Sequence, residues 1–134
     1  MKSRLIYWLT YAGMWLLALL PFRALYVLSD GFCFLMHYIV NYRRKVVRNN
    51  LHNAFPEKSE AELREIECKF YRYICDYMLE EVKMLRMSFK ELCRRMEYDN
   101  KEEYLAMIEK HGGIVLVIPH YANFEWITGM SSIM

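Results

Sequence analysis

His120 and Glu125 are the two residues whose types and spacing could perform acid–base chemistry. They lie in GGIVLVIPHYANFEW, residues 112–126, where an apolar run ends in Pro119 and the histidine, and the glutamate follows five positions later. A carboxylate beside an imidazole can fix its tautomer and stabilise its cation, which leaves the other ring nitrogen as a general base. Because this stretch contains no serine or cysteine, the base would act on a substrate hydroxyl, which predicts direct group transfer.

The spacing of this pair is weak evidence by itself, since His52 and Glu57 are separated by the same number of residues. Context favours His120, which follows IVLVI, residues 114–118, a run that is typical of a strand buried on both faces. Open α/β sheets place their sites at the carboxyl ends of such strands. Residues five apart in a helix are separated by about 140°. A bond between His120 and Glu125 therefore requires the histidine to precede the next helix.

The segments before this run have helix signals. Ser59 with Glu62 forms a capping box before a long amphipathic helix, predicted over about residues 60–86. An aromatic stripe on this helix, which includes Phe70 and Tyr73, is expected to pack in the core. Similar patterns predict helices after Ser88 and Asn100, with a brief strand around residues 96–98 between them. Glycines at 112 and 113 end the last helix. We therefore predict an α/β fold: N-terminal membrane-anchoring helices, a helical segment, and the truncated start of a mixed or parallel sheet.

The N-terminus has 18 consecutive uncharged residues, 5–22, and a second apolar stretch at 24–40. A spanning helix needs about 20 apolar residues, so the first run is marginal. It could be a short spanning helix followed by a membrane-associated one, a hairpin in one leaflet, a cleaved signal peptide or a buried soluble helix; the absence of a small-residue cleavage site argues against the signal peptide. The sequence does not decide whether residues 24–40 enter the bilayer.

Four basic residues follow the apolar segments within six positions: Arg43, Arg44, Lys45 and Arg48. Such a cluster predicts attraction to anionic lipid and places the following chain on the cytoplasmic side. The net charge of only +2 argues against nucleic-acid binding. The four cysteines lack CxxC or paired metal spacing, so we expect reduced thiols and no metal site.

These motifs together resemble the lipid A biosynthesis (lauroyl/myristoyl) acyltransferase family of Gram-negative bacteria, within the lysophospholipid acyltransferase superfamily. His120, Asn123 and Glu125 match the family's H-x-G-N-W-E block, while Ala122 and Phe124 replace its glycine and tryptophan. YRRKVVRNNLHNAFP, residues 42–56, is similar to the family segment that follows the anchor. The resemblance divides the chain into anchor helices at 1–40, a basic and amphipathic helical region at 41–111, and an incomplete catalytic core at 112–134.

The resemblance implies a membrane-associated acyltransferase at the cytoplasmic face of the bacterial inner membrane. Its partners would be an acyl carrier protein or acyl-CoA donor and a lipid A precursor or related glycolipid acceptor, without a cofactor. His120 would be the catalytic base, Glu125 its partner, and Asn123 a residue that orients the turn or the substrate. As family members are more than twice as long, we expect an N-terminal fragment that is inactive alone. The alternatives are an acyltransferase for another glycolipid or a lysophospholipid, and a non-catalytic membrane-anchored helical adaptor.

Overall fold

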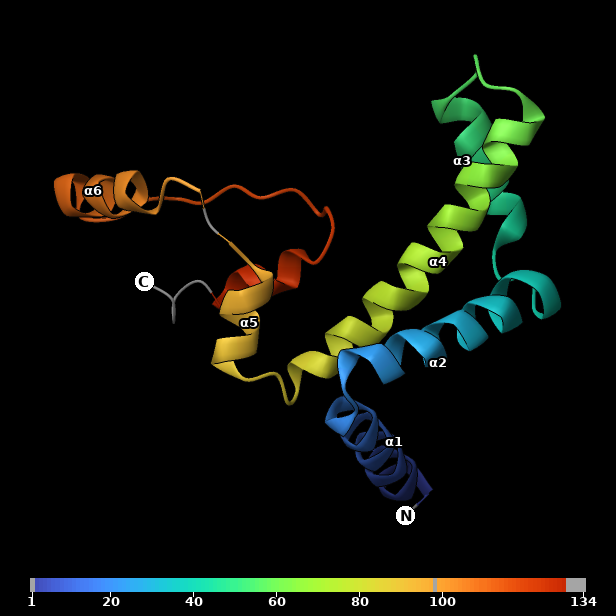
Figure 1. Cartoon of the computed structure of the whole chain (residues 1–134), viewed down its shortest axis with the longest axis horizontal. Coiled ribbons are helices and arrows are strands. Elements are labelled where there is room, and N and C mark those ends of the chain that lie inside the picture. The colour runs from blue at the N-terminus through green and yellow to red at the C-terminus, as the bar shows by residue number, and fades with distance from the viewer. Residues whose placement is uncertain (1, 98, 130–134) are drawn as a thin grey trace. The chain divides into compact units, whose positions relative to one another are not determined.

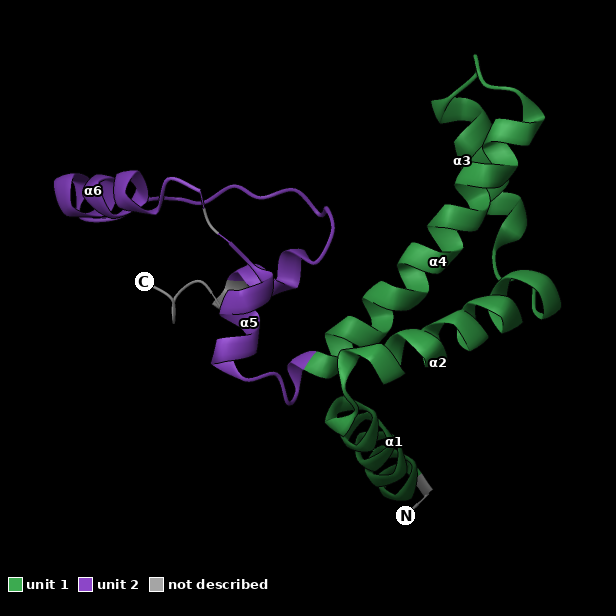
Figure 2. Cartoon of the chain, in the orientation of Figure 1, with its two compact units in different colours: residues 1–83 green, residues 84–134 purple. Residues whose placement is uncertain are grey.

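The computed structural model describes residues 2–97 and 99–129, which form helices joined by turns and one longer irregular segment (Figure 1). The α-helices in this part of the chain are α1 (Lys2–Leu19), α2 (Phe22–Phe34), α3 (Arg44–Ala54), α4 (Glu60–Met84), α5 (Phe89–Arg95) and α6 (Lys101–His111). A π-helix, η1 (Leu35–Ile39), continues α2, and a 3₁₀-helix, η2 (Phe124–Gly129), follows the irregular segment. The chain divides into two compact units, residues 1–83 and 84–134 (Figure 2).

Local capping signals set several helix boundaries as predicted, but Asn100 forms no side-chain cap hydrogen bond at the start of α6, so the capping pattern predicted there is wrong. The Glu62 backbone N–H donates to Ser59 Oγ, and the Ser59 N–H donates to Glu62 Oε2 at 2.9 Å, so the capping box at the start of α4 is complete. Ser88 Oγ accepts a hydrogen bond from the Glu91 N–H at the start of α5. Gly112 ends α6 at φ 73°, a left-handed conformation in which glycine has no steric penalty. The predicted helices in these three places are confirmed.

The buried face of α4 differs from the predicted aromatic stripe. The stripe included Phe70 and Tyr73, but these side chains are 40% and 46% exposed. The helix instead buries residues at a strict spacing of four, namely Leu63, Glu67, Tyr71 and Cys75. A glutamate therefore occupies the middle of the face that packs against the rest of residues 1–83.

The α/β prediction is wrong, because the described residues contain no strand. Residues 114–118 are irregular, and Val115 and Val117 are 90% and 89% exposed. A strand needs a neighbour to take its backbone hydrogen bonds, and the described residues supply none. The other strand predicted, around residues 96–98, is also not formed at 96 and 97; residue 98 lies outside the described residues.

The N-terminal helix ends before the end of the apolar run at residues 5–22. It ends at Leu19, before Pro21, and no helix in the described residues is by itself both long and apolar enough to cross a membrane. The pair Phe22–Ile39 and Arg44–Ala54, bent by 90°, meets the length and composition requirements together. Of the interpretations left open for the N-terminus, the short spanning helix is therefore corrected.

Helix α4 contacts the other helices of residues 1–83 along its length. At its C-terminal end, Lys83 Nζ donates hydrogen bonds of 2.7 Å to the carbonyl oxygens of Ala18 and Leu20. These are among the last carbonyls of α1 and its turn, which a cation at a helix C-terminus satisfies well. Nearby, the Tyr26 hydroxyl of α2 donates to Glu80 Oε1 at 2.6 Å. Polar contacts made by α4 thus hold the ends of α1 and α2.

The thiol of Cys75 on α4 is expected to resist alkylation. Burial, with Cys33 beside it, raises the pKa of Cys75 to about 11, so only about 0.1% would be thiolate at pH 8. Cys68 on the same helix is exposed. Iodoacetamide at pH 8, followed by peptide mass spectrometry, should modify Cys68 quickly and leave Cys75 intact until urea is added. Equal rates at both thiols in the folded protein would contradict this packing.

Candidate functional site

The residues around His120 form a tight turn ahead of η2. The Tyr121 N–H donates to the Pro119 carbonyl at 2.9 Å, and the Trp126 N–H donates to the Asn123 carbonyl at 3.0 Å. His120 therefore lies outside the helix, while Glu125 lies in its first turn. This is the arrangement that the spacing argument requires of a His120–Glu125 pair.

The two candidate catalytic side chains differ in exposure. His120 is exposed, and its ring lies beside Phe124 with the ring centroids 4.4 Å apart. Glu125 is half-buried, and its Oε2 atom is buried. No hydrogen bond joins His120 to Glu125 among the described residues. Catalytic hydrogen bonds often tighten only when substrate binds. The turn presents an imidazole that is accessible from solvent, and the carboxylate lies five residues further along the chain.

Helix η2 is anchored within the second unit by an indole. Trp126, the residue after Glu125, is only 6% exposed. Helices α5 and η2 are in contact, and α5 contributes the buried Leu92 to this unit (Figure 1). No pattern in the sequence marks Trp126 for this role. Its burial next to Glu125 limits how far the glutamate can move.

Ala122 occupies a left-handed backbone conformation with φ 52°. Non-glycine residues adopt this conformation at a cost of roughly 1–2 kcal/mol, whereas glycine adopts it freely. The family block to which this stretch is similar has glycine at the position of Ala122. The turn before η2 therefore retains the backbone shape that a glycine would favour.

Substitution of Ala122 should test this turn. We expect Ala122→Gly to raise the free energy of unfolding by about 0.5–1 kcal/mol, because relief of the left-handed strain outweighs the added freedom of the unfolded chain. Ala122→Val should lower it, since a β-branched side chain is still less compatible with positive φ. Urea denaturation followed by circular dichroism measures both. A less stable glycine variant would argue against the strain.

A second polar cluster, which no sequence motif indicates, surrounds Glu67 in the first unit. Glu67 Oε1 accepts hydrogen bonds from Arg44 Nε at 2.7 Å and lies 3.1 Å from His37 Nε2, and its Oε2 accepts from Arg48 Nε at 2.8 Å. His37 and Glu67 are each 2% exposed, and the His37 ring stacks on Tyr71 with centroids 4.5 Å apart. One buried carboxylate thus joins η1, α3 and α4.

The electrostatics of this cluster follow from its charges. Burial would raise the pKa of Glu67, but the hydrogen bonds from Arg48, Arg44 and His37 outweigh it and hold the pKa below its usual value. Burial, together with the negative charge of Glu67, raises the pKa of Tyr71. The Tyr71 hydroxyl donates to the Tyr42 carbonyl. Glu67 is therefore ionised at neutral pH, and its charge is matched by the arginines.

His52 and Glu57, the other histidine and glutamate with this spacing, do not form a site. His52 Nε2 instead lies 3.4 Å from Glu60 Oε1, and both side chains are largely exposed. No group of three or more histidine, cysteine, aspartate or glutamate side chains suited to a metal ion occurs within the described residues.

Comparison with known proteins defines the class to which this chain belongs. Residues 1–130 match the family of bacterial lipid A biosynthesis acyltransferases, so the chain belongs to this family. The resemblance predicted from the two motifs and the apolar N-terminus is confirmed. Among curated proteins, the chain is 30% identical over 122 residues to a lipid A biosynthesis lauroyltransferase of Escherichia coli (strain K12). That alignment covers 89% of this chain and 40% of the relative. No solved structure matches the chain.

Proposed function

We propose that the protein containing these residues transfers a fatty acyl chain from a thioester donor to a hydroxyl group of a lipid A precursor. The observation that carries the proposal is the HYANFE stretch, residues 120–125, within a chain that matches the acyltransferase family over residues 1–130. The exposed imidazole of His120, placed before η2, is open to an acceptor.

In the proposed reaction, an imidazole nitrogen of His120 removes the proton from the acceptor hydroxyl as its oxygen attacks the thioester carbonyl. An oxygen–carbon bond forms, and the tetrahedral intermediate then collapses. The carbon–sulfur bond breaks, and the sulfur leaves with its electron pair and takes the proton from the imidazolium. The products are the acylated lipid and the free thiol of the acyl carrier protein or coenzyme A. General-base assistance of this kind contributes about 10²–10⁴-fold to rate.

Glu125 and Asn123 have supporting roles in this proposal. The Glu125 carboxylate would turn toward His120 when substrate binds, fix its tautomer and stabilise the imidazolium. Asn123, whose carbonyl accepts the Trp126 N–H, holds the turn and could orient the acceptor. No step requires a metal or organic cofactor.

We further propose that the protein works at the cytoplasmic face of the bacterial inner membrane. Large apolar side chains on α1 are exposed, among them Leu5, Ile6, Trp8, Leu9 and Leu16, each at least 61% exposed. Apolar surface on this scale is typical of a membrane or protein interface. The basic residues 43–48 would add attraction to anionic lipid headgroups, about 1 kcal/mol for each cation near the surface.

An acyl-transfer assay with the intact protein tests the proposal. Labelled acyl chains on acyl carrier protein or on coenzyme A would be offered with a lipid A precursor, and with a lysophospholipid as the competing acceptor. We expect thioester-dependent label on the lipid A precursor. Label on the lysophospholipid alone, or on neither acceptor, would overturn the proposed acceptor.

A further inference from the structure

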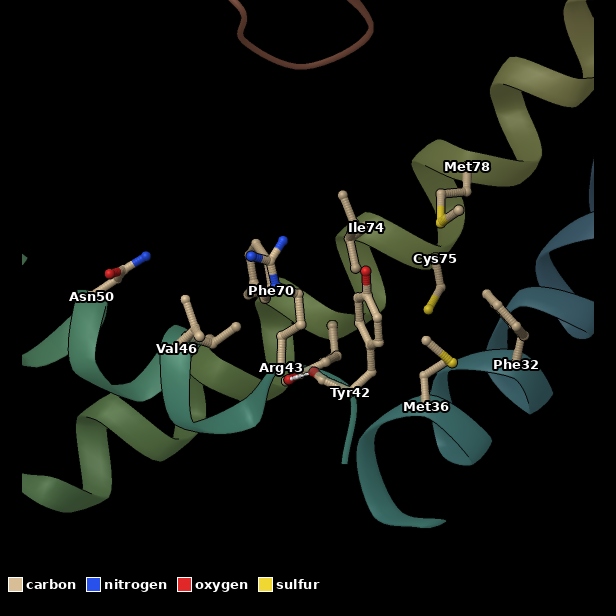
Figure 3. A pocket seen from close by; sticks show the side chains of 12 residues that line it. Phe32, Met36, Tyr42, Arg43, Val46, Asn50, Phe70, Ile74, Cys75 and Met78 are labelled. Atoms are coloured by element: carbon tan, nitrogen blue, oxygen red, sulfur yellow. Dashed lines mark hydrogen bonds between the residues drawn. The ribbon is translucent and has the colours of Figure 1, made fainter. Parts of the chain in front are cut away.

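A cavity of about 540 Å³ lies in the first unit between α2, α3 and α4 (Figure 3). Its volume is within the range of small-molecule pockets. The lining is largely apolar and comes from Phe32, Met36, Tyr42, Arg43, Val46, Val47, Asn50, Phe70, Tyr71, Ile74, Cys75 and Met78. The side chains of Tyr42 and Met78 are about half-exposed, so the cavity opens to the surface.

The two ends of this cavity differ in chemistry. Figure 3 shows Phe32, Met36 and Met78 gathered around Cys75 at one end, and Asn50 at the other. The Arg43 side chain extends from the start of α3 toward α4 between these ends. The cavity is therefore an apolar slot at the Cys75 end and has polar groups, Arg43 and Asn50, from its middle to its other end. This lining suits an amphiphile better than a purely apolar or purely ionic ligand.

A basic hollow of about 490 Å³ adjoins the slot, because the two share Arg43 and Val46 in their linings. Asn41, Arg44, Lys45 and Arg48 complete the hollow. Among the described residues, neither Arg43 nor Lys45 forms an ion pair. Arg43 lies at φ 50°, a left-handed conformation that is strained for arginine. Such strain persists where surrounding structure enforces it, often at functional sites.

The other two cations of the hollow are held in place by Glu67. Arg44 and Arg48 each use Nε to bind this buried carboxylate. Their side chains are 32% and 45% exposed. A guanidinium carries five donors. Arg44 also donates from Nη1 to Asn41 Oδ1 at 3.0 Å, so the remaining terminal N–H groups of the two arginines are the donors for an anion. Arginines fixed in this way lose little side-chain freedom when they bind a phosphate.

The segment that precedes the hollow in the chain exposes apolar side chains. Phe34, Ile39 and Val40, at the end of α2 and along η1, are 58%, 63% and 54% exposed. Apolar side chains next to cations are the combination that binds the headgroup region of an anionic membrane. The occupant suggested by these neighbours is a lipid rather than a soluble anion.

We propose that the slot and the hollow bind one anionic phospholipid of the membrane. One acyl chain would enter the slot toward Met36 and Met78, and the phosphate would lie on Arg43 and Lys45, with Arg44 and Arg48 beside it. This site uses residues of the first unit, whereas the candidate catalytic pair belongs to the second unit. It would fix the protein to anionic lipid through one specific molecule, in addition to general adsorption of α1.

Native mass spectrometry of the full chain, released from a neutral detergent, tests the site. The probes are dioleoyl phosphatidylglycerol, dioleoyl phosphatidylcholine and inorganic phosphate. We expect one tightly retained phosphatidylglycerol, at least tenfold weaker retention of phosphatidylcholine, and no retained phosphate. Arg43→Gln with Lys45→Gln should weaken phosphatidylglycerol about tenfold, the effect of losing hydrogen bonds to a charged group. Lys69→Gln with Arg72→Gln, which removes two exposed cations of α4, is the charge-matched control.

Variants that fill the slot distinguish an acyl chain bound in the slot from a lipid held only by its headgroup. Ile74→Trp should abolish retention of phosphatidylglycerol. If circular dichroism shows that this variant loses helicity, Met78→Trp, at the more exposed end of the slot, is the second variant. Val27→Trp adds the same ring at a residue that is 71% exposed on α2 and outside the slot, and it should bind normally. His120→Ala should also bind normally, so a failed catalytic proposal would leave this one standing. Equal retention of both lipids, retention of phosphate alone, or normal binding by the slot-filled variants would overturn it.

Discussion

Replacing His120 with alanine is expected to lower acyl transfer by the intact protein about 10²–10⁴-fold, because the acceptor hydroxyl loses its general base. The side chain is exposed, so its removal should not destabilise the fold. The rate of label transfer from the thioester donor to the acceptor measures the effect, with donor and acceptor both saturating. Unchanged helicity and an unchanged urea midpoint would show that the loss is chemical.

The chain supplies a matched control for this substitution. His52 also precedes a glutamate by five residues, but its imidazole lies beside Glu60 on the surface. His52→Ala should therefore leave the rate within about twofold of the wild-type value, since loss of an exposed ion pair has little effect. Glu125→Gln should retain the shape of the turn and lose part of the rate. A His120→Ala protein with wild-type turnover would remove the catalytic role.

Replacing Glu67 with alanine is expected to lower the free energy of unfolding by about 3 kcal/mol. Breaking a buried ion pair costs roughly 3–5 kcal/mol, and the lower end applies because Arg44 and Arg48 are partly exposed and can regain water. His37, at 2% exposed, would keep an unmatched ring nitrogen in the core. Urea denaturation followed by circular dichroism measures the change.

Glu65→Gln is the control for substitution of Glu67, because it also removes one carboxylate from α4. Glu65 is 67% exposed and pairs with Lys69 four residues on, so its loss should leave the urea midpoint unchanged. A Glu67→Ala protein as stable as the Glu65→Gln protein would contradict the buried network. Glu67→Gln should fall between the two, because an amide keeps the shape and one acceptor but loses the charge.

The Glu67 network also predicts how stability depends on pH. The pKa of Glu67 is lower in the folded protein than its usual value near 4.5, so folding favours the ionised form. The stabilisation is therefore complete above the unfolded pKa and is lost as the pH falls through the folded pKa. Urea midpoints should decline below about pH 4.5 in the wild type and less steeply in Glu67→Gln. Parallel declines would assign the acid sensitivity to other carboxylates.

The sequence by itself determined the features that depend on neighbours within four or five positions. The capping boxes at Ser59 and Ser88 and the glycine after α6 correctly predicted where helices begin and end. The spacing of His120 and Glu125 correctly predicted that His120 precedes the following helix. The order of the two motifs predicted the family. Each of these signals lies within a short segment, and none of them requires contact with residues far away in the chain.

Tertiary structure alone decided what the remaining residues do. The apolar run at 114–118 predicted a buried strand, but a strand exists only if another segment accepts its hydrogen bonds. No pattern in the sequence marks Glu67, yet partners 19, 23 and 30 residues earlier surround it. Whether a carboxylate is buried depends on charges that another helix brings to it. Pairings at these distances leave no periodic trace in the sequence, so only the folded chain reveals them.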